Sequence, residues 1–150
     1  MLLRTHLAIG IAVGLYFLPF VNYEFIFVPI ILISSLLPDA DVFFPKFRRK
    51  EFSNSQKDTD PRGILHTYTF CVGVSIIIAF IYPIVALPFF MGYSFHLLAD
   101  SFTKAGIRPF WPFKTRSTGV VKTGGIVEKL LFITFTIIDV VLAIMTLSRI

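Results

Sequence analysis

The chain has 150 residues, of which 55% are apolar and 15% charged, with a formal net charge of +5. Soluble domains are about 45–50% apolar and about 25% charged, and disordered chains are poor in apolar residues. The composition therefore excludes a disordered chain and an ordinary soluble domain, and it predicts a small integral membrane protein. The single cysteine also excludes an intrachain disulfide and a cysteine-rich zinc site.

Five apolar segments follow one another along the chain: 7–21, 25–37, 64–82, 84–98 and 126–147. We expect each to be helical, because backbone that faces lipid must satisfy its own hydrogen bonds. A full span needs about 20 residues, so the third and fifth segments are long enough and the other three are short. The predicted fold is all-α: one integral membrane domain over residues 1–150, with about five apolar helices that make four or five spans.

The connections between these segments alternate between tight turns and long basic loops. Residues 21–24 and Pro83 form the tight turns, which carry no cation, whereas most of the 14 Lys and Arg residues lie in the loops 38–63 and 101–125. The positive-inside rule then places the N-terminus and both long loops in the cytoplasm. We expect a multi-pass protein of the cell membrane. A cleaved signal peptide over 1–21 is the rival interpretation, but the small-residue cleavage site that it needs is absent.

The three histidines and three of the nine acidic residues fall at one predicted depth, at helix ends on the cytoplasmic side. These six residues are His6, Asp39, Asp41, His66, His96 and Asp100. His96 and Asp100 are four residues apart and so share one helix face. Few other ionisable groups lie so close to the apolar segments, and this placement makes the six the candidate functional residues.

The three acids lie at the C-terminal ends of helices, where the helix dipole disfavours an anion by about 0.3–1 kcal/mol each. They therefore need a counter-charge. Lys104 could supply it for Asp100, and Asp39 with Asp41 could form a solvated turn after Pro38. A divalent metal would use the imidazoles as well, and imidazole with carboxylate is a typical ligand set for zinc, with manganese and iron as alternatives.

Four motifs of this sequence are familiar: RTHL at 4–7, LLPDAD at 36–41, RGILHT at 62–67 and GYSFHLLADSFT at 92–103. Together with Gly106 and the sequence WPF at 111–113, they resemble the YdjM-like family of membrane-bound, metal-dependent hydrolases of bacteria and archaea. That family is distantly similar to zinc-dependent phospholipase C and the P1-type nucleases. The resemblance covers residues 4–113 and leaves out the last apolar segment, 126–147.

The resemblance implies hydrolysis of a phosphoester or phospholipid, with one or two metal ions held by the six candidate residues. Asp41 would then act as general base, and Arg62 would meet a phosphate. Val42 and Pro61 stand where the family usually has histidine, which removes two ligands. The expected partners are membrane lipids and an amphiphilic phosphoester substrate, with no nucleic acid.

Two other functions stay open at this point. The missing histidines favour a non-catalytic membrane protein of the same scaffold that binds a metal or a lipid headgroup. A small transporter component would need polar groups in the middle of the membrane, and Asp139 is the main candidate for one.

Overall fold

The structure is a computed structural model that describes residues 1–42, 63–113 and 115–148, without the side chains of residues 41 and 42. These ranges contain five α-helices: α1 (Leu3–Phe17), α2 (Glu24–Leu36), α4 (Tyr68–Ile81), α5 (Pro83–Ser101) and α6 (Ile126–Leu147). Three short 3-10 helices accompany them: η1 (Leu18–Phe20), η2 (Leu37–Val42) and η3 (Ile64–His66). The described ranges hold no β-strand, only two isolated bridges. The prediction of an all-α protein with five apolar helices is confirmed.

Three helical stretches in the described part of the chain are long and apolar enough to cross a membrane: Leu3–Phe20, Pro83–Ser101 and Ile126–Leu147. The expectation that 64–82 is one of the longest helices was wrong. The Thr67 side chain accepts a hydrogen bond from the Phe70 backbone N–H and caps the helix, so α4 begins at Tyr68 and has only 14 residues. The first and fourth helical stretches are longer than the predicted segments, because α1 continues into η1 to give 18 residues over Leu3–Phe20 and α5 takes in Pro83 as its first residue.

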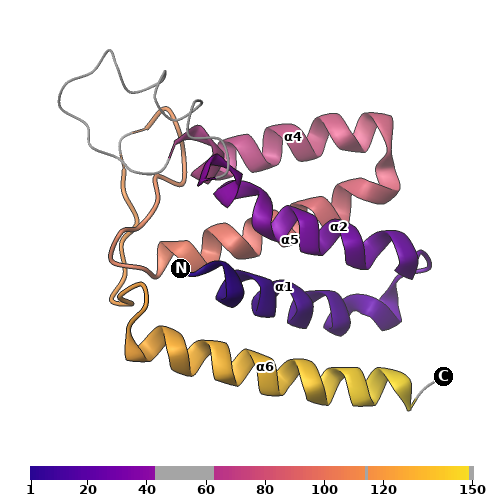
Figure 1. Cartoon of the computed structure of the whole chain (residues 1–150). Coiled ribbons are helices and arrows are strands. Elements are labelled where there is room, and N and C mark those ends of the chain that lie inside the picture. Colours follow the sequence, from indigo (N-terminus) through magenta and orange to yellow (C-terminus); the bar gives the residue numbers. More distant parts are fainter. Residues whose placement is uncertain (43–62, 114, 149–150) are drawn as a thin grey trace.

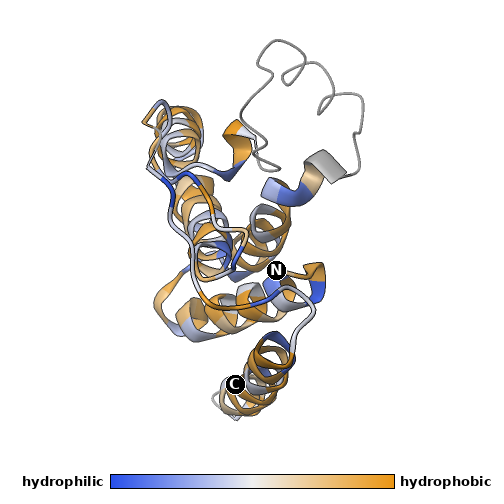
Figure 2. Cartoon of the chain, turned by 90° about the vertical axis from the view of Figure 1, so that its left-hand side faces the viewer, coloured by the Kyte–Doolittle hydropathy of each residue, from blue (hydrophilic) through white to orange (hydrophobic). Residues whose placement is uncertain are grey.

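The helices lie side by side, with α4 at one edge of the bundle and α6, next to α1, at the other (Figure 1). The start of α1, the ends of α2 and α5, and the starts of α4 and α6 all lie at one end of the bundle. Figure 2 looks onto this end and shows hydrophobic residues around the outer sides of the helices. Side chains such as Phe25 and Phe80, which are 94% and 87% exposed, suit contact with lipid.

The closest helix contacts involve two glycines that face the serine pair of α2. A Cβ added at Gly92 would lie 2.1 Å from Ser34 Oγ and 2.4 Å from the Ile31 carbonyl oxygen, and one at Gly10 would lie 2.7 Å from Ser35 Oγ. Both serine hydroxyls donate to carbonyls of α2 itself, over 3.1 Å and 2.8 Å. Small residues with satisfied hydroxyls allow membrane helices to approach closely, so α5 packs directly against the backbone of α2 and α1 packs against the Ser35 side chain.

Helix α6 packs along α1, and buried polar contacts join the two helices at their starts. Glu128 is 1% exposed and is the one buried residue among the described residues of α6. Its carboxylate accepts hydrogen bonds from the Thr5 hydroxyl, over 3.1 Å, and from the backbone N–H of Leu2. The first turns of α1 and α6 are therefore joined by buried polar contacts, whereas the rest of α6 is apolar and largely exposed.

The contact between Gly92 and α2 predicts that Gly92→Ala will destabilise the protein. The added methyl group cannot fit without moving α5 away from α2, and such overpacking costs about 1–3 kcal/mol. Unfolding of the purified protein in detergent, followed by circular dichroism, should show this loss. Gly73→Ala is the matched control, since nothing lies within 4 Å of a Cβ at that position of α4. Equal stability of the two variants would contradict the close approach.

Candidate metal centre

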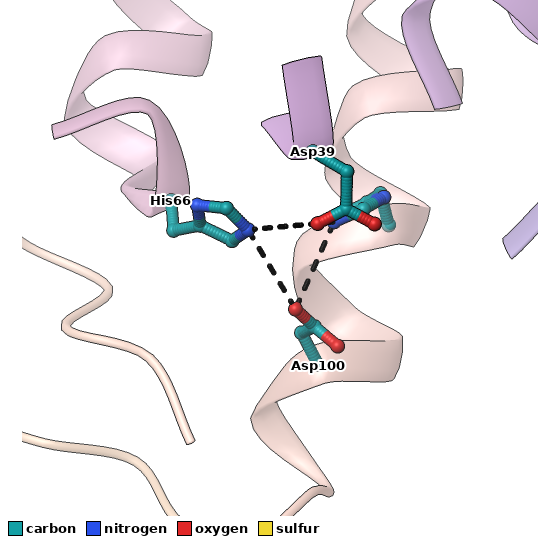
Figure 3. Close-up of side chains that lie close together, drawn as sticks. Asp39, His66 and Asp100 are labelled. Carbon is teal, nitrogen blue, oxygen red and sulfur yellow. Dashed lines mark hydrogen bonds and ion pairs between the residues drawn. The ribbon is translucent and has the colours of Figure 1, made fainter. Parts of the chain in front are cut away.

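Four side chains from three elements converge at the end of the bundle (Figure 3): Asp39 of η2, His66 of η3, and His96 and Asp100 of α5. One donor atom from each lies within 4.8 Å of the others, and we call this set the four-donor group. His66, His96 and Asp100 are buried, and the Asp39 side chain is 21% exposed. The structure thus brings together four of the six residues that the sequence singles out.

The distances within the four-donor group suit a tetrahedral metal ion. His66 Nε2 lies 3.4 Å from Asp39 Oδ1 and 3.8 Å from Asp100 Oδ2, and His96 Nε2 lies 3.7 Å from each of the same oxygens. Donors held about 2.0–2.2 Å from an ion at the corners of a tetrahedron are about 3.3–3.6 Å apart. The contact between His66 and Asp39 also serves as a long hydrogen bond, since N–H···O bonds are usually about 2.7–3.2 Å. The donor set could therefore hold a divalent metal ion.

The His96 ring is held in the orientation that a metal ligand needs. Its Nδ1 lies 2.7 Å from the Ser35 carbonyl oxygen, which can only accept, so Nδ1 carries the hydrogen and donates it. In the neutral ring Nε2 then has a free lone pair. That atom is buried without a hydrogen-bond partner among the described residues. A histidine that donates one ring N–H to a carbonyl and presents the other nitrogen to an ion is the usual arrangement in metal sites.

Asp39 is the member of the four-donor group that reaches solvent. Burial acts to raise its pKa, but the hydrogen bond from His66 and the charges of the nearby histidines outweigh this, so the pKa lies below its ordinary value. Asp39 is therefore ionised at neutral pH and available to a cation. Its contact with His66 also argues against the alternative that Asp39 only forms part of a solvated turn.

His6 lies beside the four-donor group but does not belong to it. Its ring stacks on that of His96, with centroids 3.7 Å apart and an interplanar angle of 15°. Its Nε2 is 3.3 Å from Asp100 Oδ1, which the Met1 amino group also contacts. Asp100 thus presents one oxygen to His6 and the other to the four-donor group. A carboxylate in this position could bridge two sites.

The remaining two residues of the sequence prediction cannot be placed at the centre. Asp41 lies in η2, but its side chain is outside the described part of the structure, and Arg62 lies outside the described residues altogether. Their roles as general base and phosphate ligand stay predictions.

Two contributions to the site escaped the sequence analysis. One is the Ser35 carbonyl, because backbone acceptors leave no mark in a sequence. The other is Tyr93, which is fully buried in α5 and donates from its hydroxyl to the Leu65 carbonyl over 2.6 Å. This bond ties η3 to α5 next to His66. The position of Tyr93, one turn before His96 and inside the 92–103 motif, was the available signal.

The bond from Tyr93 predicts that Tyr93→Phe weakens metal binding while the fold persists. Losing the hydroxyl frees η3, so His66 is less well oriented, and changes of this kind typically cost about 10–100-fold in affinity. Competition for zinc with a chromophoric chelator would measure the loss. Tyr82→Phe is the control, since Tyr82 is 68% exposed at the far end of the bundle. Unchanged affinity in Tyr93→Phe would show that η3 is held by other contacts.

Comparison with known families agrees with the motifs. The model of one family, described as YdjM inner membrane protein, matches residues 1–149, which includes α6 as well as the four motifs. No curated protein and no solved structure gives a significant match. The family match and the apolar helices together show that the chain is a membrane protein. Its buried Asp/His group could hold a metal ion. The chain belongs to the YdjM inner membrane protein family.

Proposed function

We propose that the protein is a membrane-bound, metal-dependent hydrolase of a phosphoester or phospholipid. The observation that carries the proposal is the geometry of the four-donor group: its four His–Asp distances are 3.4–3.8 Å, all four donors lie within 4.8 Å of one another, and His96 Nε2 is buried and faces both carboxylates. When bound, a divalent metal supplies a water of lowered pKa, about 7, and a Lewis acid for a phosphoryl oxygen. Zinc is the first candidate, and manganese and iron are the alternatives.

The residues of the chain have separate tasks in this proposal. His66, His96 and Asp100 hold the ion from the buried side. Asp39, the exposed member, lies where water and substrate enter. His6 holds Asp100 by its second oxygen, over 3.3 Å, and so leaves Oδ2 for the ion. A second ion, where one binds, would be held by His6 and by Asp100.

The substrate class follows from where the site lies. The four-donor group lies at the end of the bundle where the candidate span α5 ends (Figure 1), and the two basic loops connect helices at this end. In this proposal that end lies at the depth of the lipid headgroups. We place this end and the N-terminus in the cytoplasm, by the positive-inside rule. Arg62 would bind a phosphate through two of its oxygens, and Asp41 would take the proton of the attacking water. An amphiphilic phosphoester of the membrane fits these tasks.

A non-catalytic metal protein is the second candidate. Four protein ligands around a tetrahedral ion are typical of structural zinc sites, whereas catalytic sites keep one position open. Val42 and Pro61, in place of histidines, point the same way. The two candidates agree on metal binding and differ on turnover.

Both candidates predict a stoichiometric transition metal in the purified protein. The full chain, carrying a C-terminal tag without histidine, should retain zinc after dialysis, as measured by inductively coupled plasma mass spectrometry. His96→Gln and Asp100→Asn should lose the ion, because each removes a buried donor. Asp139→Asn, in the middle of α6, is the control and should keep it. A wild-type protein without metal, or a His96→Gln variant with full metal content, would refute the site.

Turnover separates the two candidates. We expect the zinc-loaded protein in detergent to release product from phospholipids or from a chromogenic phosphodiester, and Asp41→Asn to lower the rate by about 10²–10⁴, the usual contribution of a general base. Arg62→Gln should raise KM for the phosphoester. Lys122→Gln, in the second basic loop, serves as the charge-matched control. Full metal content with no hydrolysis of either substrate would support the non-catalytic candidate instead.

A further inference from the structure

A turn in the loop between α5 and α6 presents three aromatic side chains to the surface. The Phe113 backbone N–H donates to the Phe110 carbonyl over 2.8 Å and closes the turn. Phe110, Trp111 and Phe113 are 59%, 50% and 70% exposed, and we call these three residues the aromatic turn. Large apolar side chains that are exposed together mark a surface that contacts a membrane or another protein.

The aromatic turn is fixed to the first residues of α4. The Tyr68 backbone N–H donates to the Pro109 carbonyl over 2.8 Å. The Thr69 hydroxyl donates to the Trp111 carbonyl over 2.9 Å, and the Tyr68 and Phe110 rings have their centroids 6.4 Å apart. Figure 1 shows the loop in orange beside the start of α4. The position of the aromatic turn is therefore set by this end of the helix.

Thr69 begins the stripe of α4 that faces lipid. After Thr69, which is itself exposed, exposed residues recur at helical spacing: Val72, Gly73, Ile76 and Phe80. Residues at this spacing lie on one face of a helix, and all but the glycine are large and apolar. Helix α4 lies at the edge of the bundle (Figure 1), so in a membrane protein this face meets lipid. The bond from Thr69 therefore places Trp111 at the end of a lipid-facing surface.

The other end of α4 carries a matching residue. Tyr82 directly follows the helix and is exposed. Tryptophan and tyrosine are enriched at both membrane–water interfaces, because their rings are apolar whereas the indole N–H and the phenol hydroxyl bind water. Helix α4 has only 14 residues, about 21 Å, whereas the hydrocarbon core is about 30 Å thick. Aromatic residues at its two ends extend the apolar surface of this short helix.

We propose that the aromatic turn is an interfacial anchor: Phe110, Trp111 and Phe113 lie among the lipid headgroups and the first acyl carbons, at the end of the bundle that holds the four-donor group. The partner is the bilayer itself, and the surface of contact continues the lipid-facing stripe of α4. The anchor holds the loop between α5 and α6 at the membrane surface. The inference rests on the membrane location of the helices and on these contacts, and it requires neither a metal ion nor turnover.

The test uses the unmodified full chain, because Trp111 is its single tryptophan and all tryptophan emission comes from it. The protein is reconstituted into vesicles of phosphatidylcholine that carries bromine atoms either near the headgroup or near the end of the acyl chain. We expect strong quenching by the shallow bromine atoms and weaker quenching by the deep ones. The result should be the same with and without zinc, so a failure here is distinct from a failure of the metal centre.

Helix α4 supplies the matched control. The double variant Trp111→Phe/Ile76→Trp moves the tryptophan to the lipid-facing stripe, about 10 Å along the helix from Thr69, and should be quenched more by the deep bromine atoms. Absence of bromine quenching in the wild type would overturn the proposal. Quenching by acrylamide would then show that the aromatic turn lies in water, and protection from acrylamide would show that a protein chain covers it. A wild-type depth profile equal to that of the control variant would overturn the proposal as well.

Discussion

The close approach of α5 to α2 is the constraint on which the centre depends. Gly92 lets α5 lie against the backbone of α2 at Ser34 and Ile31. One turn further along α5, the same proximity brings His96 Nδ1 to within 2.7 Å of the Ser35 carbonyl. The Ser35 carbonyl can accept the hydrogen bond from His96 because it lies near the C-terminal end of α2, where the helix passes into η2. The orientation of the metal-facing nitrogen is therefore a result of how two helices pack.

In the described part of the chain, the buried histidines and acids lie at one end of the bundle, and each acid there contacts a neighbour. Membrane protein interiors tolerate ionisable groups when they pair with one another or line a site. Here Asp39 and Asp100 face three histidines, and Glu128 faces the start of α1. In place of water, these carboxylates contact imidazole rings or accept hydrogen bonds from backbone N–H groups. The free-energy cost of placing Asp39 and Asp100 at the C-terminal ends of helices is offset by the neighbouring histidines, which are also possible metal ligands.

Much of this arrangement was predictable, and the reasons for the exceptions are physical. Hydropathy and the distribution of cations placed the three histidines with Asp39 and Asp100 at one end, because helix ends of an antiparallel bundle must meet there. The start of α4 was not predictable from hydropathy, since the apolar segment begins at Ile64 and Leu65 whereas the helix begins only after the Thr67 N-cap. His6 lies outside the four-donor group because its ring stacks on His96, and ring stacking depends on the packing of α1, which no spacing rule gives.

The order of the donors along the chain has a consequence for how the protein is made. Asp39 leaves the ribosome early, His66 later, and His96 and Asp100 last, at the end of α5. Until α5 has entered the bilayer and packed against α2, the earlier donors lie beside unfinished helices and hold no ion. An ion held by these four residues would therefore have to bind after insertion of the first four helices. It would join three separately inserted segments of the chain and oppose their removal from the membrane.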